Sequence, residues 1–590
     1  MATEDDRWVR LQREPASRVS QLWMSIAERI DRYIGWDKLP LVLGIPTLIG
    51  LRDRLRHENL FDTGVPEMGG SSPGNLACRT VDGTWNDRAH PMMGAAGTRF
   101  GRNIRPANHL PESQPALLTP NPRTVSRTLL TRDQFIPATT LNMLAGAWLQ
   151  FEVHDWFSHG IEREDPFVLP VEPGDQWPRA AVVIERTPRG DAPGVFRSED
   201  THWWDGSQIY GTSAEQQKLL RDGERLKVKN GTILGDHFDF SGKHAGFWTG
   251  LAALHTLFAL EHNAICEHLQ KEEKRAWEEE ELFQTARLIN VALLAKIHTT
   301  EWTPAVLAHP TTQMGIKMNW WGISQRLKRS VGRVSTSEVI SGIVGSPADH
   351  HGAPYCLTEE FSAVYRMHPL VPDDFIFHSP AGGSDRRPMS LTELRTRQAI
   401  PVLRELGMPS VLYTFGISHP GAITLHNYPR TLQEFDREGE LFDLAATDIL
   451  RDRERGIPRY NRFREAFHKA PVRRFDQLSA NPAWAEEIRR VYEDDIDAVD
   501  LMVGLLAEPR PRGFGFSDTA FRVFHLMASR RLKSDRFFTD CYNAEHYTKA
   551  GLDWIDNNSM KTVLLRHFPT LAPALGPVEN AFAPWARVVR

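Results

Sequence analysis

The sequence predicts a mostly α-helical protein: one large helical catalytic body with little β structure. Composition is ordinary for a globular chain, with 590 residues, 41% of them hydrophobic and 25% charged. No repeat of about 20–50 residues is visible, which argues against a solenoid. Apolar residues recur at helical spacing over 141–158, 247–271, 281–308, 355–367, 484–507 and 517–533. The best strand signals are AAVVIE (180–185) and GTILG (231–235).

Along the chain, we divide residues 1–60, an N-terminal helical segment, from a catalytic domain over 61–590. Residues 1–35 have an amphipathic helical pattern, and 60–135 form a long irregular segment rich in Gly, Pro, Asn and Ser. The stretch KLPLVLGIPTLIGL (38–51) is apolar but too short to cross a bilayer. It either packs on the body or rests in a membrane interface; its mixed Pro and Gly favour packing.

Charge and cysteine content exclude several classes of protein. A net charge of −5 and a pI near 6.6, without a basic tract, argue against a nucleic-acid partner. Seventeen Trp and twenty-nine Phe favour apolar ligands. The four cysteines are scattered and form no CxxC pair, which indicates neither a zinc site nor a disulfide framework. No signal peptide or transmembrane run is present, so we expect a cytoplasmic protein; its oligomeric state stays open.

Two pairs of side chains suggest a cofactor. Gln150 and His154 lie four residues apart, and Tyr365 and His368 lie three apart. On helices these offsets bring side chains onto one face. Two imidazole-bearing faces, one with a phenol beside it, are what a haem enzyme that handles peroxide requires. Each pair alone has an ordinary alternative, a buried histidine bonded to the backbone or an aromatic core residue followed by a surface histidine.

The segment THWWDGS offers oxygen ligands at alternate positions. Thr201, Trp203, Asp205 and Ser207 point the same way along an extended chain. Their hydroxyls, carboxylate and main-chain carbonyls are hard donors suited to Ca²⁺, and Asp155, next to His154, can complete the set. By itself DGS is only a turn signal.

Several motifs in order make the chain resemble the haem peroxidase–cyclooxygenase superfamily, and most closely the fatty-acid α-dioxygenases of plants and bacteria. The resemblance runs from about residue 30 to the C-terminus. The motifs are QFEVHDW (150–156), THWWDGSQIYG (201–211), LHTLFALEHNAI (254–265), AKIHTTEWT (295–303), YRMHPLVPD (365–373), RDRERGIPRYNRFR (451–464), DTAFRVFHLMASRRLKSDRFFTD (518–540) and YTKAGLDW (547–554).

The resemblance implies a role for each residue of the two pairs. His154 would be the distal histidine with Gln150 beside it, and His368 the proximal ligand of the haem iron. Tyr365 would carry a radical. Asn427 would accept the other N–H of His368 and so fix its tautomer.

The same resemblance bears on how haem and calcium are held. Mammalian peroxidases of the superfamily carry acidic residues, esterified to haem, where Val153 and Phe247 stand here. Their absence implies non-covalent haem b. The family pattern also contains the T-x-aromatic-x-D-x-S and His-Asp elements, which supports the calcium prediction.

A fatty-acid substrate needs an apolar channel and a cationic contact for its carboxylate, because an unpaired buried anion is very costly. In the α-dioxygenases a His, a Thr and an Arg hold this carboxylate, which implies His298, Thr303 and Arg531 here. The choice of Arg531 over Arg530 rests on the resemblance alone. From composition, His298 would be a core residue and both arginines solvated.

The resemblance therefore implies haem-dependent α-oxygenation of long-chain fatty acids, activated by a hydroperoxide. O₂ would be inserted at C2 through a tyrosyl radical on Tyr365, giving a 2-hydroperoxy acid. The alternative is a general haem peroxidase that oxidises small donors, and a rival from another class is a non-catalytic haem or lipid carrier. Whether residues 38–51 also make peripheral contact with a membrane stays open.

Overall fold

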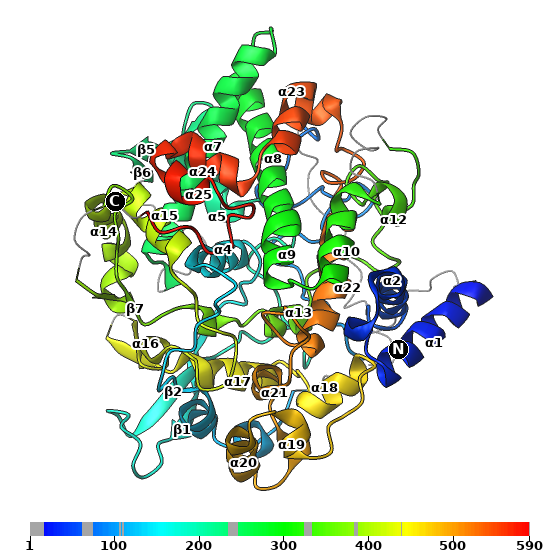
Figure 1. Cartoon of the computed structure of the whole chain (residues 1–590), viewed down its shortest axis with the longest axis vertical. Coiled ribbons are helices and arrows are strands. Elements are labelled where there is room, and N and C mark those ends of the chain that lie inside the picture. Colours follow the sequence, from blue (N-terminus) through cyan, green and yellow to red (C-terminus); the bar gives the residue numbers. More distant parts are fainter. Residues whose placement is uncertain are drawn as a thin grey trace.

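The computed structural model describes residues 17–61, 75–105, 108, 111–233, 246–323, 333–382, 387–437 and 439–588. Helices make up most of these residues, as predicted (Figure 1). Those of the first half are α1 Arg18–Tyr33, α2 Leu41–Glu58, α3 Pro122–Val125, α4 Met143–Val153, α5 Ser207–Tyr210, α6 Ala214–Leu220, α7 Thr249–Glu272 and α8 Glu279–Ile297. Those that follow are α9 Thr303–Val306, α10 Pro310–Trp321, α12 Glu338–Ser341, α13 Glu359–Val364, α14 Ala399–Leu406, α15 Met408–Ile417, α16 Arg430–Gln433, α17 Leu444–Glu454, α18 Tyr460–Ala466, α19 Phe475–Leu478, α20 Pro482–Val491, α21 Leu501–Ala507, α22 Asp518–Ser534, α23 Ala544–Asn557, α24 Met560–His567 and α25 Ala572–Leu575.

The β structure consists of small antiparallel pairs at the margins of the helical body. The longest pair joins β1 (Glu162–Pro170) to β2 (Ala181–Arg186), and it confirms the strand predicted over 180–185. Of the second predicted strand, over 231–235, the structure describes β6 (Thr232–Ile233), and residues 234–235 lie outside the described residues. The other strands are β3 Arg221–Asp222, β4 Arg225–Leu226, β5 Val228–Lys229, β7 Asp374–Phe375, β8 Met389–Ser390, β9 Phe435–Arg437 and β10 Glu440–Phe442.

The centre of the body is a set of helices that are apolar on almost every side. α7 packs against α8 and against α4, and α23 and α24 cover α7 (Figure 1). Nearly all side chains of α4 and α8 are buried. A helix that is hydrophobic all round belongs inside a large protein, so polar side chains on α4 and α8 are buried with it. His154 and His298, which follow directly after α4 and α8, are therefore buried, and Gln150 on α4 is half-buried.

The N-terminal segment forms two helices, α1 and α2, that pack on each other. α2 covers 41–51 of the apolar stretch without a break, and Pro46 lies inside the helix. Packing of α2 against α10 and α22 offsets the missing hydrogen bond. The predicted boundary at residue 60 remains a prediction. The part of the predicted N-terminal helix over residues 1–16 lies outside the described residues.

Two of the predicted helices are divided. The segment 484–507 is broken between α20 and α21, where Glu493 and Asp494 have positive φ and Asp495 accepts a hydrogen bond from the backbone of Asp497. Acidic side chains there compete with the helix for backbone hydrogen bonds. The segment 281–308 is interrupted by a π-helical turn over His298–Trp302. Within the described residues, no helix combines the length and apolarity needed to span a bilayer.

Candidate active site

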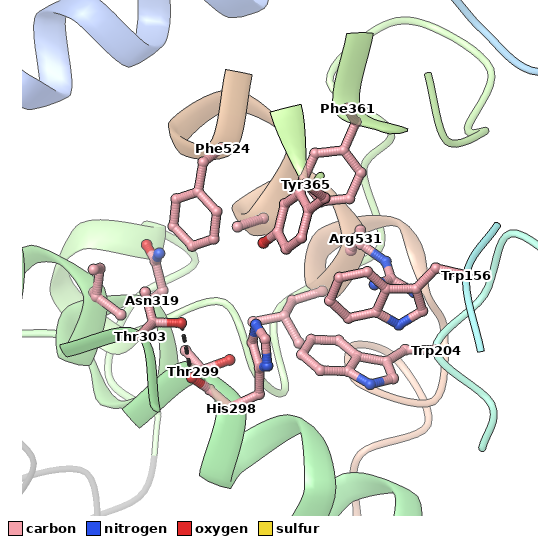
Figure 2. A pocket seen from close by; sticks show the side chains of 13 residues that line it. Trp156, Trp204, His298, Thr299, Thr303, Asn319, Phe361, Tyr365, Phe524 and Arg531 are labelled. Carbon is pink, nitrogen blue, oxygen red and sulfur yellow. Dashed lines mark hydrogen bonds between the residues drawn. The ribbon is translucent and has the colours of Figure 1, made fainter. Parts of the chain in front are cut away.

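A buried pocket brings together residues that the sequence places far apart. Its empty volume is about 400 Å³, including open solvent at its mouth. Figure 2 shows Tyr365, His298 and Arg531 around one space, contributed by the end of α13, the π-turn and α22. The lining residues are Trp156, Trp204, His298, Thr299, Thr303, Ile316, Asn319, Phe361, Tyr365, Phe524, Ala528, Arg531 and Leu532.

Arg531 is a buried cation without a counter-ion in contact. Its guanidinium carbon lies 4.2 Å from the ring centroid of Trp156 and 4.9 Å from that of Trp204. The residue is only 2% exposed, and none of its guanidinium nitrogens has a hydrogen-bond partner among the described residues. Aromatic faces compensate only part of the cost of burying a charge. This pocket is therefore prepared to receive an anion.

The neighbouring Arg530 is engaged elsewhere. Its guanidinium donates to the backbone carbonyls of His350, Ala353 and Pro354, the last two at 2.9 and 2.6 Å. It does not line the pocket. The structure thus supports the choice of Arg531, which the sequence alone did not justify.

His298 presents a hydrogen-bond donor to the same space. Its Nδ1 accepts from the indole Nε1–H of Trp148 at 3.2 Å, and an indole nitrogen can only donate. The neutral ring must therefore carry its proton on Nε2. Burial, and then the charge of Arg531, hold the pKa of His298 well below its usual value, so the ring stays neutral.

The hydroxyl of Thr303 plays a different part from the one predicted. It donates to the carbonyl of His298 at 2.8 Å, across the π-turn, and its proton is not available to a substrate (Figure 2). Thr299 lines the same pocket and makes no side-chain hydrogen bond with the described residues. Sequence analysis missed Thr299, because only the shift of hydrogen bonding within His298–Trp302 turns it toward the pocket.

Tyr365 is enclosed by aromatic rings. Its centroid is 4.6 Å from that of Phe361 and 5.3 Å from that of Trp156. Burial raises the pKa of its phenol well above the usual value, so the phenol keeps its proton. The prediction that Tyr365 and His368 share a helix face is wrong, because α13 ends at Val364 and His368 begins a separate 3₁₀ turn.

His368 faces a carboxylate rather than an amide. Its Nδ1 lies 3.1 Å from Oδ2 of Asp448 in α17, and its ring is 5.6 Å from that of Tyr428. Burial opposes ionisation of Asp448, yet the charges of His368 and Arg366 lower its pKa overall. A carboxylate on Nδ1 leaves Nε2 free to bind a metal and increases its basicity, so this imidazole fits an axial haem ligand.

Asn427, the predicted partner of His368, is occupied otherwise. Its Oδ1 accepts from Nε of Arg132 and from the backbone of Ile136, at 3.0 and 3.1 Å. Its Nδ2 donates to the carbonyls of Ile136 and Ala422. In this structure Asp448 takes the place assigned to Asn427. Nothing in a single sequence links position 448 to a histidine 80 residues earlier.

Gln150 and His154 face a common point, as their spacing predicted. The amide of Gln150 is held at both ends, accepting from Trp248 Nε1 at 2.7 Å and donating to the carbonyl of Gly246 at 3.1 Å. A β-carbon on Gly246 would lie 3.6 Å from His154 Nε2. A fixed amide beside an imidazole, next to a residue without a side chain, fits the distal side of a haem.

The predicted calcium ligands also come together in the interior. Oδ1 of Asp155 accepts from the backbone N and the hydroxyl of Ser207, at 2.6 and 2.7 Å, and Oδ2 of Asp205 accepts from the Thr201 hydroxyl at 2.9 Å. Trp203, between Thr201 and Asp205 in the sequence, is buried as they are. Burial, and then Asp205, raise the pKa of Asp155 well above its usual value. Oδ2 of Asp155 has no hydrogen-bond partner among the described residues, so the donor set fits a cation.

Glu152 is a buried acid that sequence analysis did not single out. It lies in the apolar helix α4, is 0% exposed, and accepts from Trp204 Nε1 at 2.9 Å through Oε2. Burial raises the pKa of Glu152 to about 8, against the opposing effects of Trp204 and Arg531. The signal available in the sequence was an acid in the middle of an otherwise apolar helix.

A helical body that carries two such imidazole sites and a buried phenol fits the class of haem-dependent oxidoreductases. A model of the animal haem peroxidase family matches residues 78–575. The chain belongs to this family and, within it, to the α-dioxygenases.

The relatives are similar over nearly the whole chain. "Alpha-dioxygenase PIOX" of Pisum sativum is 36% identical over 95% of this chain and 91% of its own length. A crystal structure of fatty acid alpha-dioxygenase from Arabidopsis thaliana has a TM-score of 0.89 and 33% identity, covering 97% of this chain and 94% of that one. A Tyr-to-Phe variant of the Oryza sativa enzyme, crystallised with palmitic acid, has a TM-score of 0.89 and 30% identity, with 98% of both chains covered.

Proposed function

We propose that this protein uses haem to oxygenate long-chain fatty acids at C2, giving 2-hydroperoxy acids. The observation that carries the proposal is the pocket that holds a buried, unpaired cation, Arg531, together with the phenol of Tyr365. A carboxylic acid anchored there has its second carbon beside the phenol. The palmitic acid bound to the Oryza sativa relative is a ligand of this chemistry.

The carboxylate would be held by two donors. The guanidinium of Arg531 supplies a bidentate charged contact, and Nε2–H of His298 supplies a neutral one. Because His298 stays neutral, the pocket carries one positive charge for one negative ligand. Thr299 offers a further hydroxyl. The bound anion would replace the missing partner of Arg531, which makes substrate binding and charge compensation the same event.

Haem, when bound, would supply the oxidising power obtained from a hydroperoxide. On the distal side His154 would move the peroxide proton, and the fixed amide of Gln150 would orient the peroxide. Tyr365 would lose a proton and an electron to become a neutral radical and then take a hydrogen atom from C2 of the acid. O₂ would add to the carbon radical, and the resulting peroxyl would recover a hydrogen atom from Tyr365, so the acid gains one O₂.

The chain's own residues also suggest how its cofactors are bound. His368, with Asp448 behind it, would bind the iron. Val153 and Phe247 have no carboxyl group to esterify, which supports non-covalent haem b. We assign a calcium ion to the donors Asp155, Thr201, Trp203, Asp205 and Ser207, because Oδ2 of the buried Asp155 has no hydrogen-bond partner among the described residues. The guanidinium of Arg287, 4.0 Å from Oδ2 of Asp205, compensates only one of the two carboxylate charges.

A second cavity would receive the acyl chain. Its empty volume is about 520 Å³, and it shares Ile316 and Asn319 with the first pocket. Phe521, in this cavity, lies ten residues before Arg531 on α22, which is about 15 Å of helix. The apolar lining includes Ile45, Leu48, Ile49, Ile316, Met318, Val339 and Phe521. A long chain anchored at Arg531 would extend between α2, α10 and α22 toward the surface.

Peripheral membrane contact would place this cavity beside a source of fatty acid. One face of α1 and the start of α2 leave large apolar side chains exposed, among them Val19 at 78% and Val42 at 77%. The exposed basic residues Arg18, Arg29 and Lys38 lie on the same two segments. This combination suits an interfacial helix on an anionic bilayer. Co-sedimentation with anionic vesicles would test it, and lack of binding would refute it.

Oxygen consumption by the purified holoenzyme with hexadecanoic acid tests the proposed function. We expect O₂ uptake and a 2-hydroperoxy product in the wild type, and none in Tyr365→Phe with an unchanged haem spectrum. Oxidation of guaiacol by peroxide without O₂ uptake on fatty acid would favour a general peroxidase instead. Bound haem with neither activity would indicate a carrier.

A further inference from the structure

Glu152 occupies an unusual position for an acid. It lies in α4 among apolar side chains, and its carboxyl is fully buried. Oε2 accepts a hydrogen bond from Trp204, and Oε1 has no partner among the described residues. Burying a carboxyl with half of its hydrogen-bonding capacity unused is costly, so the bond to Trp204 must compensate.

Trp204 forms a wall of the pocket that holds the acid group. One face of its ring lies 4.9 Å from the guanidinium carbon of Arg531. His298 meets the same ring edge to face, with centroids 5.2 Å apart, and Trp156 meets it at 5.7 Å. Figure 2 shows Trp204 beneath Trp156, next to His298 and Arg531. The orientation of the Trp204 indole therefore fixes the positions of the Arg531 guanidinium and the His298 ring.

We propose that Glu152 is a positioning residue of the carboxylate site, holding Trp204 so that Arg531 and His298 face the acid group of the substrate. The inference rests on the proposed function, since it takes the ligand to be a carboxylic acid. Glu152 acts from behind the wall and does not line the pocket. An apolar residue at this position would leave the indole N–H unsatisfied and free the ring to rotate.

The test uses the holoenzyme and three variants. Glu152→Leu removes the acceptor, Glu152→Gln keeps one, and Trp204→Phe removes the donor but keeps a ring. For hexadecanoic acid we expect Glu152→Leu to raise KM about tenfold, the value of one hydrogen bond, with little change in kcat. Glu152→Gln should restore KM to the wild-type value.

The double variant, Glu152→Leu with Trp204→Phe, tests whether Glu152 acts through Trp204. Both substitutions remove the same hydrogen bond, so their effects on KM should not add, and the double variant should match Trp204→Phe alone. Fully additive losses would overturn the inference. If Glu152→Leu does not fold, the comparison of Glu152→Gln with Trp204→Phe still decides, because Gln should preserve KM and Phe should not.

A ligand without a carboxylate isolates the acid site. Hexadecan-1-ol has the same chain, so Glu152→Leu should weaken binding of the acid and leave binding of the alcohol unchanged. Equal weakening of both ligands would overturn the inference and indicate a purely structural role. Equilibrium binding followed by tryptophan fluorescence needs no turnover. A wild type that binds the acid but consumes no O₂ would refute the proposed function, while this comparison would still decide the role of Glu152.

Discussion

Replacing Arg531 by methionine should separate substrate binding from stability. Among the described residues that line the pocket, Arg531 alone carries a charge. Removing one partner of a buried charged pair costs roughly 2–5 kcal/mol of binding free energy. At 1.4 kcal/mol per factor of ten, we expect kcat/KM for hexadecanoic acid to fall about 100-fold or more.

Stability should respond in the opposite sense. Among the described residues, no anion contacts the buried guanidinium of Arg531, and the rings of Trp156 and Trp204 compensate part of its charge. Methionine removes that charge and keeps most of the volume, so the free energy of unfolding should stay equal or rise. Oxygen uptake and thermal unfolding of the holoenzyme measure both effects.

Two comparisons make the test decisive. Arg531→Lys keeps the positive charge but loses the planar pair of N–H donors, so its kcat/KM should lie between those of the wild type and of Arg531→Met. Arg530 donates to backbone carbonyls outside the pocket, so Arg530→Lys should lower the free energy of unfolding and leave KM close to the wild-type value. A methionine variant that retains near-wild-type kcat/KM, or unfolds much more readily, would refute the reasoning.

Four further predictions follow from other parts of the site. Asp448→Asn should weaken haem binding about tenfold or more by removing the carboxylate behind His368, and a Soret titration matching wild type would contradict this. Asp155→Ala, or chelation of divalent ions, should lower the melting temperature and abolish the effect of added Ca²⁺; a melting temperature that chelators do not change would argue against calcium. Leu48→Phe should shorten the preferred acyl chain in a kcat/KM series, and the same preference as wild type would place the chain elsewhere. The pKa of Glu152 is raised to about 8, so this acid ionises as the pH rises through that value. Its negative charge would then compete with the substrate carboxylate for Arg531, so KM should rise above about pH 8 in the wild type and stay flat in Glu152→Gln.

Much of the helical fold could be predicted because its signals are local. Apolar periodicity identified α4, α7, α8 and α22, with boundaries shifted by a few residues. The breaks were missed where side chains compete with the backbone, as at Asp495, or where one extra residue enters a helix, as at His298–Trp302. Neither event changes the hydrophobic pattern that the prediction used.

The site was predicted to different depths for a similar reason. Spacing indicated that Gln150 and His154 face one point, and both do lie near Gly246, because Gln150 is on α4 and His154 caps the same helix. It failed for Tyr365 and His368, since the helix ends at Val364, before both of them, and His368 begins a separate turn. Partners such as Asp448 and Glu152 depend on packing between elements, which a single sequence does not encode in any local pattern.

The π-helical turn at His298–Trp302 gives the carboxylate site an unusual dependence on chain length. Such a turn accommodates one residue more than an α-helical turn. Deleting any one residue within it would let α8 and α9 merge into a regular helix, with the ring of His298 or the hydroxyl of Thr299 rotated by about 100°. A substitution in this turn changes one side chain of the pocket, whereas an insertion or deletion would turn the donors His298 and Thr299 away from it together.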